Sequence, residues 1–358
     1  MSASVFEDPW LSGLFGDDEI AAIWSHRARL AHMLAFEVAW SRALGSVGLA
    51  EAGAAEEAAA AILATRVDDD AIRAGTARDG VPVPALVRAL RAEAGAGPVH
   101  DGATSQDVID TALALTLKAT SDLVAARLIR LGQALEALDA RFGHVPLMGR
   151  TRMQAATEIS AGDRIASWRL PLEDHADRLR VLRPRIECVQ VGGAAGDRRA
   201  LGRHAQAVTD HVADSLGLAA TARAWHARRD GVAEFAGFLS LVTGTLGKIG
   251  QDIALMAELG DIALSGGGGS SSMPHKQNPV LAELLVTLAR FNAVQLSGMH
   301  QALVHEQERS GAAWMLEWMI LPQMASAAAR ALAAGITLIE SVVRIADFPA
   351  AESRGREE

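Results

Sequence analysis

The sequence predicts an all-α protein in which long helices pack side by side as a bundle. Alanine and leucine dominate the apolar half of the 358 residues and aromatic residues make up 4%, a composition that favours helix. Prolines, which break helix interiors, are absent from three long stretches. Within those stretches apolar residues recur every three or four positions, a spacing that places them along one face of a helix.

The first 98 residues predict a separate small helical domain. Their Ala-rich segments are shorter than the segments that follow. An acidic run at 68–70 and the sequence GVPVP at 80–84 interrupt them. Because glycine and proline favour turns, the second interruption predicts a break between short helices. We therefore place one domain at residues 1–98.

The three proline-free stretches, 99–145, 185–273 and 280–321, predict the long helices. Each helix would have about 25–35 residues and be roughly 40–50 Å long at 1.5 Å per residue. The first stripe misses one position, at Thr120, and otherwise consists of Ile109, Leu113, Leu117, Val124, Leu128, Leu131, Leu135 and Leu138. The second has no gap and consists of Phe235, Leu239, Val242, Leu246, Ile249, Ile253 and Met256. The third is looser and consists of Leu281, Leu284, Leu288 and Phe291.

Helices of this length, with near-heptad stripes, are typical of a helical bundle. They are longer than one ordinary globular domain requires, so we expect other copies of the chain to cover part of each stripe. The bundle domain spans residues 99–345, and the polar residues 346–358 form a frayed tail. No period-2 strand pattern and no β-hairpin signal competes with this interpretation.

Composition and charge exclude several classes of function. The chain has no tyrosine, and its single cysteine, Cys188, excludes an intramolecular disulfide and a multi-cysteine zinc site. A net charge of −9 argues against a nucleic-acid partner. The N-terminus lacks a basic region followed by an apolar one, and the longest uncharged apolar stretch, 235–247, is too short to cross a bilayer. We therefore expect a soluble, cytoplasmic protein without a membrane partner.

Three polar segments interrupt the helical pattern with residues that bind anions or move protons. Segment 1 is HDGATSQD at 100–107, directly before the first long stripe. Thr104 or Ser105 would make a good helix N-cap there, with Asp107 in the first turn. The segment is either a cap and a turn only, or a site at which hydroxyls and free N–H groups hold a carboxylate.

Segment 2 is GRTRMQAATEIS at 149–160. It is either a solvated loop or an anion site, because arginine binds a carboxylate through two parallel hydrogen bonds. Segment 3 is GGGGSSSMPHKQNP at 266–279 and lies between two helical stripes of the same bundle. It does not match a phosphate-binding P-loop. A long flexible insertion inside a compact domain is more often functional than accidental, so we interpret its glycines as the hinge of a mobile catalytic loop.

With all three segments in view, the chain resembles the fumarase/aspartase superfamily. Segment 3 is similar to the signature GSSxMPxKxNP, segment 1 to HxGxTSxD and segment 2 to GRTHxQ, in the same order and at compatible spacing. The resemblance implies a homotetramer with a central core of twenty helices, in which three subunits contribute to each active site. This chain is short for the superfamily, which implies that the small C-terminal domain is largely absent.

Within the superfamily, the chain resembles most the bacterial 3-carboxy-cis,cis-muconate cycloisomerases, through MPHKQNP at 273–279 and HEQERSGAAWMLEW at 305–318. This resemblance implies an isomerase, an intramolecular lyase of the protocatechuate branch (β-ketoadipate pathway) of aromatic compound degradation. It would act on a small tricarboxylate without a cofactor or a metal. Two alternatives stay open. One is an adenylosuccinate-type lyase that releases fumarate, because MPHK also occurs in those enzymes, and the other is an inactive structural homologue.

The resemblance assigns roles to residues of all three segments. Ser270 matches the proton-transferring serine of the mobile loop, while Lys276 and Asn278 match residues that hold the substrate carboxylate. A fixed ammonium there would stabilise the second negative charge that develops when carbon next to a carboxylate is deprotonated. The other expected substrate-binding residues are His100, Thr104, Ser105, Thr151, Gln154 and Met273, with Arg309 as a further carboxylate ligand.

Arg152 stands where the superfamily usually has the histidine of GRTHxQ. A guanidinium, with a pKa above about 12, cannot protonate a departing amine. Lactone formation needs no such acid, because the substrate's own carboxylate is the nucleophile. We therefore expect Arg152 to be catalytic by orienting that carboxylate for attack. Glu283 matches the acidic partner of the missing histidine, and we expect it to pair with Arg152.

Overall fold

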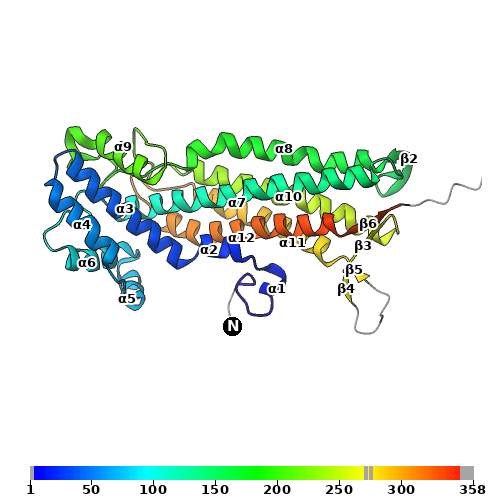
Figure 1. Ribbon diagram of the computed structural model, residues 1–358, viewed down its shortest axis with the longest axis horizontal. Coiled ribbons are helices and arrows are strands. Elements are labelled where there is room, and N and C mark those ends of the chain that lie inside the picture. The colour runs from blue at the N-terminus through cyan, green and yellow to red at the C-terminus, as the bar shows by residue number, and fades with distance from the viewer. Residues whose placement is uncertain (1–3, 270–272, 274–276, 347–358) are drawn as a thin grey trace, which may run out of the picture.

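The computed structural model describes residues 4–269, 273 and 277–346. This part of the chain forms an elongated bundle of α-helices, with shorter helices gathered at one end and small β-ribbons at the other (Figure 1). The prediction of an all-α helical bundle is confirmed.

The N-terminal part consists of six helices that lie at one end and along one side of the bundle (Figure 1). Asp68 caps the fifth of them by accepting hydrogen bonds from two backbone N–H groups, and Gly80 ends it in the left-handed conformation, with φ 73°. The acidic run and GVPVP therefore mark the start and end of one helix. The six helices are α1 (Ser12–Phe15), α2 (Asp18–Ile23), α3 (His26–Ser46), α4 (Ala52–Ala64), α5 (Asp69–Asp79) and α6 (Val83–Ala94).

Five long helices run along the long axis of the molecule (Figure 1). The predicted stripe of the middle one, α10, is buried at every position, as the 3.6-residue period requires. At the missing position in α7, Thr120 accepts a hydrogen bond from the indole N–H of Trp24 at 3.1 Å. The long helices are α7 (Ser105–Phe142), α8 (Ala161–Ile186), α10 (Asp230–Glu258), α11 (Val280–Gln301) and α12 (Ala312–Glu340), and a 3-10 turn η1 (Arg199–His204) and helix α9 (Ala205–Leu216) connect α8 to α10.

The proline-free stretches located α7, α10 and α11, but two long helices run through prolines. Pro171 and Pro184 lie inside α8, and Pro322 lies inside α12. Leu172, which follows Pro171, and Leu321, which precedes Pro322, are buried in the core. Packing of the apolar face therefore stabilises both helices despite the lost backbone hydrogen bonds.

Among the described residues, strands form three two-stranded antiparallel ribbons. They are β1 (Pro146–Thr151) with β2 (Gln154–Ser160), β3 (Ile262–Leu264) with β6 (Val342–Ile345), and β4 (Gly268–Gly269) with β5 (Gln277–Asn278). The expectation that no hairpin competes with the helices was wrong for the first ribbon. Its two-residue turn consists of Arg152 and Met153, with φ 49° and 65°. Asn-Gly is the usual signal for such a turn, and neither residue gives it.

Two apolar cores form inside the molecule. The larger one consists of buried residues of α7, α8, α10, α11 and α12. The smaller one joins α3, α4 and α6 to the first turns of α7 and to α9. Phe36 and Trp40 stack in it with ring centroids 5.5 Å apart. The domain boundaries at residues 98 and 345 stay a prediction.

In the described part of the chain, α10, α11 and α12 are long and apolar enough to cross a membrane by length and composition alone. The expectation that no segment has that length was wrong, because it counted only uncharged residues. Of the most apolar 18-residue window, 61% is buried inside the fold in α10 and 67% in α12, but only 28% in α11. The apolar side chains of α11 are therefore the least covered within one chain.

Candidate functional site

The structure separates the three polar segments. Segment 1 precedes α7 at the end where the short helices gather, whereas segments 2 and 3 lie with the β-ribbons at the other end (Figure 1). Helix α7 joins segment 1 to segment 2 and has 38 residues, a length of ~57 Å at 1.5 Å per residue. Segment 1 therefore cannot meet segment 2 of the same chain, and the β4–β5 ribbon at the described ends of segment 3 also lies at the opposite end (Figure 1).

Segment 1 ends in the N-cap of α7. Thr104 has extended backbone and is the N-cap, and its N–H donates to the Asp107 carboxylate at 3.0 Å. The predicted cap is confirmed. Ser105 is the first helical residue and is half-buried. The first N–H groups of a helix that follow such a cap, together with the helix dipole, favour an anion at this point.

Asp107 holds segment 1 against the loop that contains Gly192 and Gly193. Its carboxylate is fully buried and accepts from Gly192 N at 2.8 Å, Gly193 N at 2.9 Å and His226 Nε2 at 2.9 Å, besides Thr104. Gly192 has to be glycine, because a Cβ there would lie 2.5 Å from a ring carbon of His226. Charge-assisted hydrogen bonds of this kind are stronger than neutral ones, so the start of α7 and the glycine loop are held together rigidly.

Arg309 extends segment 1 with a cation. Its Nη1 donates to Thr104 Oγ1 at 2.8 Å, across 205 positions of sequence, and the residue is exposed. Two residues predicted to bind carboxylate are therefore in contact. The guanidinium keeps further N–H donors for a ligand, and a planar fork of donors suits a carboxylate.

His100 opens segment 1 and is held by a buried carboxylate. Its Nδ1 lies 2.6 Å from Oε1 of Glu37, and the Glu37 side chain is fully buried. The His100 backbone has a φ of 62°, which is uncommon for a residue other than glycine. A carboxylate on one ring nitrogen fixes the orientation of the imidazole and leaves the other nitrogen for a ligand.

A buried ion cluster near segment 1 links α7, the start of α10 and α12. Arg229 donates to Asp110 Oδ2 at 2.8 Å and to Glu317 Oε1 at 2.8 Å, and Trp314 donates to Asp110 Oδ1 at 3.1 Å. Burial alone would raise the pKa of Glu317, but hydrogen bonds from Arg229 and the proximity of His305, whose Nε2 lies 3.5 Å from Oε1, outweigh it and hold the pKa below its ordinary value. Trp314 is thus a buried residue of this cluster.

Segment 2 is an exposed hairpin tip. Thr151 pairs with Gln154 at the last register position, and the turn between them presents Arg152 and Met153. All four residues are exposed, and Met153 has 76% of its surface accessible. The exposed turn therefore leaves the Arg152 side chain open to solvent in a single chain.

The described ends of segment 3 form a short ribbon. Gly268 pairs with Asn278 and closes the two ends of the loop. Gly268 has to be glycine, because a Cβ there would lie 2.6 Å from the Val280 side chain. Asn278 is half-buried in the ribbon, and Met273 is 41% exposed. The predicted catalytic residues Ser270 and Lys276 lie outside the described residues.

Glu283 lies in the first turn of α11, next to the segment 3 ribbon, and is exposed. Within the described part of one chain it forms no ion pair with Arg152. The expected pair between them therefore stays a prediction for contacts between subunits.

Several residues of the segment 1 environment were not anticipated from the sequence. They are Glu37, Gly192, His226, Arg229 and Glu317. Glu37 carried a usable signal, because it interrupts the apolar run MLAFEVAW at 33–40 on a buried helix face. The others gave none, since their partners lie 85 or more positions away along the chain. No group of three or more His, Cys, Asp or Glu side chains in the described residues has the geometry of a metal site.

Comparison with known proteins gives concordant matches. Residues 15–294 match the family model described as Lyase. The chain is 40% identical over 332 residues to the 3-carboxy-cis,cis-muconate cycloisomerase of Pseudomonas aeruginosa, a match that covers 90% of this chain and 72% of the relative. The crystal structure of the 3-carboxy-cis,cis-muconate lactonizing enzyme from Pseudomonas putida matches with a TM-score of 0.87 and 36% identity, over 94% of this chain and 77% of that one. A fumarate lyase structure from Mesorhizobium sp. BNC1 matches with a TM-score of 0.86 and 32% identity, over 92% and 76%.

Proposed function

This chain belongs to the fumarase/aspartase superfamily of lyases, and we propose that it is a 3-carboxy-cis,cis-muconate cycloisomerase. The relatives that match 90% and 94% of the chain carry that activity in their names. The geometric support for the proposal is the contact between Arg309 and Thr104 at the start of α7. This contact makes an exposed cationic site for a carboxylate. The reaction would form a carboxymuconolactone without a cofactor.

The proposed reaction closes a ring by intramolecular addition. One carboxylate oxygen of the substrate forms a C–O bond to a carbon of the conjugated diene, and the electron pair of that double bond moves toward the neighbouring carboxylate. A proton is then added to carbon, so the lactone carries one negative charge fewer than the substrate. The protein has to orient the nucleophile, stabilise the developing charge and deliver one proton.

The three polar segments supply candidates for all three tasks, of which Ser270 and Lys276 lie outside the described residues. Arg309, Thr104 and the N-terminus of α7 would hold one carboxylate of the substrate. Arg152, on the hairpin tip, would align the attacking carboxylate. Lys276 and Asn278 would stabilise the charge that develops on the third carboxylate, and Ser270 would deliver the proton. His100, oriented by Glu37, would contact the substrate beside Thr104.

We further propose a homotetramer with shared active sites, in the cytoplasm. The ~57 Å length of α7, which separates segment 1 from segment 2, supports sharing, because another copy of the chain is needed to bring these two segments together. The exposed apolar side chains of α10 and α11 support association, since Leu241 is 53% and Val294 72% accessible in one chain. In such an assembly a small tricarboxylate would contact residues of several subunits at once.

The proposal is tested by mixing purified protein with 3-carboxy-cis,cis-muconate and following the ultraviolet absorbance of the conjugated diene. Rapid loss of absorbance is expected, together with a carboxymuconolactone identified by NMR. A Ser270→Ala variant of the same oligomeric state should lose the activity. A folded, assembled wild-type protein that leaves the diene intact would show that the activity is a different one.

A further inference from the structure

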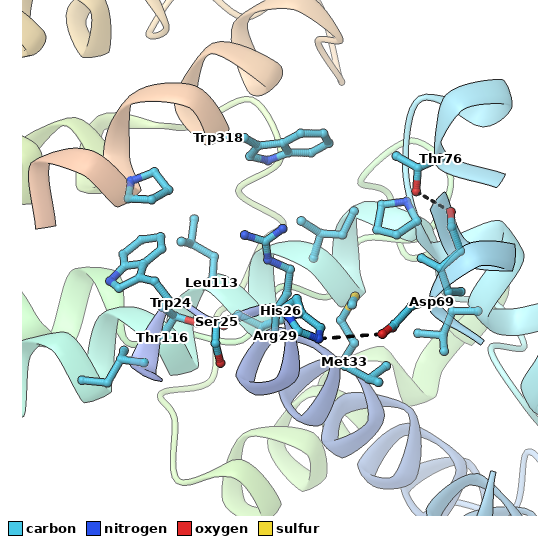
Figure 2. A pocket seen from close by; sticks show the side chains of 18 of the residues that line it. Trp24, Ser25, His26, Arg29, Met33, Asp69, Thr76, Leu113, Thr116 and Trp318 are labelled. Atoms are coloured by element: carbon cyan, nitrogen blue, oxygen red, sulfur yellow. Dashed lines mark hydrogen bonds and ion pairs between the residues drawn. The ribbon is translucent and has the colours of Figure 1, made fainter. Parts of the chain in front are cut away.

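A cavity of about 290 Å³ lies between the N-terminal helices and the bundle (Figure 2). Its walls come from α2, α3, α5 and α6 on one side and from α7 and α12 on the other. It therefore sits where the two apolar cores meet. None of the described residues assigned to the substrate site lines it.

The walls of the cavity are mostly apolar. Trp24, Leu113 and Trp318 enclose it on different sides (Figure 2). Further apolar surface comes from Ile23, Leu30, Met33, Val67, Ile72, Leu86, Ile109 and Leu321. Cavities of this kind, with a few polar groups among apolar walls, are typical of small-molecule sites, whose volumes begin at about 300 Å³. The volume here fits one small molecule of about one or two fused rings.

Nearly all polar groups on the walls already have partners. The His26–Asp69 pair, 3.8 Å apart, lies at the exposed rim. The carboxylate of Glu317 is taken up by Arg229. The hydroxyls of Ser25, Thr76 and Thr116 donate to backbone carbonyl groups one helical turn earlier. These groups leave little capacity to bind a polar ligand.

Arg29 differs from the other polar groups on these walls. Its side chain rises from α3 into the cavity, and its guanidinium points toward Trp318 (Figure 2). Among the described residues it has no carboxylate or carbonyl partner. Solvent reaches the residue, and the side chains packed around its guanidinium lower the pKa of Arg29. Because water reaches this guanidinium, it stays charged without a protein partner, and its N–H donors are available to a carboxylate that enters the cavity.

We propose that this cavity is a second ligand site, which binds a small aromatic monocarboxylate. The carboxylate would pair with Arg29, the single unpaired cation on the described walls, and the ring would lie against Trp24, Leu113 and Trp318. One cation and a large apolar surface suit a monoanion with an apolar body. The tricarboxylate expected at the substrate site carries too many charges for these walls.

The probe for this site is 2-naphthoate, with its neutral isostere 2-naphthamide as the reference. Isothermal titration of the full-length protein should show one naphthoate per chain, with the amide binding at least about tenfold more weakly. Arg29→Met should lower the affinity for naphthoate by about the same factor. Arg27→Met is the matched control, because Arg27 is exposed on the same helix and does not line the cavity. This control should keep wild-type affinity.

A second variant tests the location of the ring independently of the charge. Leu113→Trp fills the cavity from α7 and should abolish binding of naphthoate, while circular dichroism shows an intact helical fold. The proposal is overturned if Arg29→Met binds naphthoate as tightly as Arg27→Met does, or if the amide binds as tightly as naphthoate. Naphthoate binding that survives in folded Leu113→Trp places the ligand elsewhere and overturns it as well.

Discussion

Two inactive variants of this protein should restore each other's activity when they are mixed. Arg309 lies with segment 1 and Arg152 with segment 2, at opposite ends of the ~57 Å helix α7. Arg309→Ala and Arg152→Ala each remove one proposed charged ligand of the substrate. Each change should lower kcat/KM by about tenfold to a hundredfold, the usual effect of losing one hydrogen bond to a charged group. Each homotetramer should therefore be nearly inactive.

The size of the recovery follows from the arrangement of the site. In randomly mixed tetramers, half of the sites receive segment 1 from a chain with intact Arg309. Half of those receive segment 2 from a chain with intact Arg152. Hybrid tetramers formed at a 1:1 ratio should thus regain about a quarter of wild-type activity. The diene absorbance assay measures this recovery, and native mass spectrometry shows that hybrids have formed.

The matched control uses two variants from the same end of the molecule. Thr104→Val and Arg309→Ala change residues that contact each other within one chain, at 2.8 Å. No site in their hybrids contains an intact segment 1, so these hybrids should stay at the level of the separate variants. Hybrids of Arg309→Ala with Arg152→Ala that stay equally inactive would refute the shared-site reasoning. Recovery in the Thr104→Val control would refute it too.

Three further predictions concern buried polar groups. Gly192→Ala places a Cβ 2.5 Å from a ring carbon of His226, and urea unfolding should show a loss of about 1–3 kcal/mol, the usual cost of overpacking. Arg229→Leu leaves two buried carboxylates without their cation, and the same assay should show a loss of about 3–5 kcal/mol. Burial lowers the pKa of His175 from 6.5 to about 4, so the unfolded chain takes up this proton first, and stability falls as the pH drops from about 6.5 towards 4. From pH 7 to pH 5 the loss should be about 2 kcal/mol larger in the wild type than in His175→Gln. An equal pH dependence of the two proteins would contradict this assignment.

The sequence predicted the helices best where one apolar stripe determines them. Every stripe residue of α10 is buried, because period 3.6 and the absence of proline point to the same structure. The β1–β2 hairpin was missed because its turn residues, Arg152 and Met153, adopt positive φ without the glycine or asparagine that signals it. The helices α8 and α12 were missed because tertiary packing outweighs the local effect of Pro171 and Pro322.

Local sequence predicted individual residues of the candidate site, but it did not predict which residues contact one another there. Thr104 was recognised as an N-cap from local sequence, since capping depends on residues three positions apart. Its contact with Arg309 joins positions 205 residues apart, and the support of His100 by Glu37 joins positions 63 apart. Such contacts follow from the packing of whole helices, which no local pattern records.

The length of α7 also limits how this protein can change in evolution. In the proposed tetramer, the length of α7 sets the distance between two segments that each reach a different neighbour. Deleting a single residue would shorten it by about 1.5 Å and rotate one end against the other by roughly 100°. Such a deletion would move every later side chain of the helix off its face of the core. Substitutions along α7 can therefore accumulate, whereas insertions and deletions should be excluded between Ser105 and Phe142.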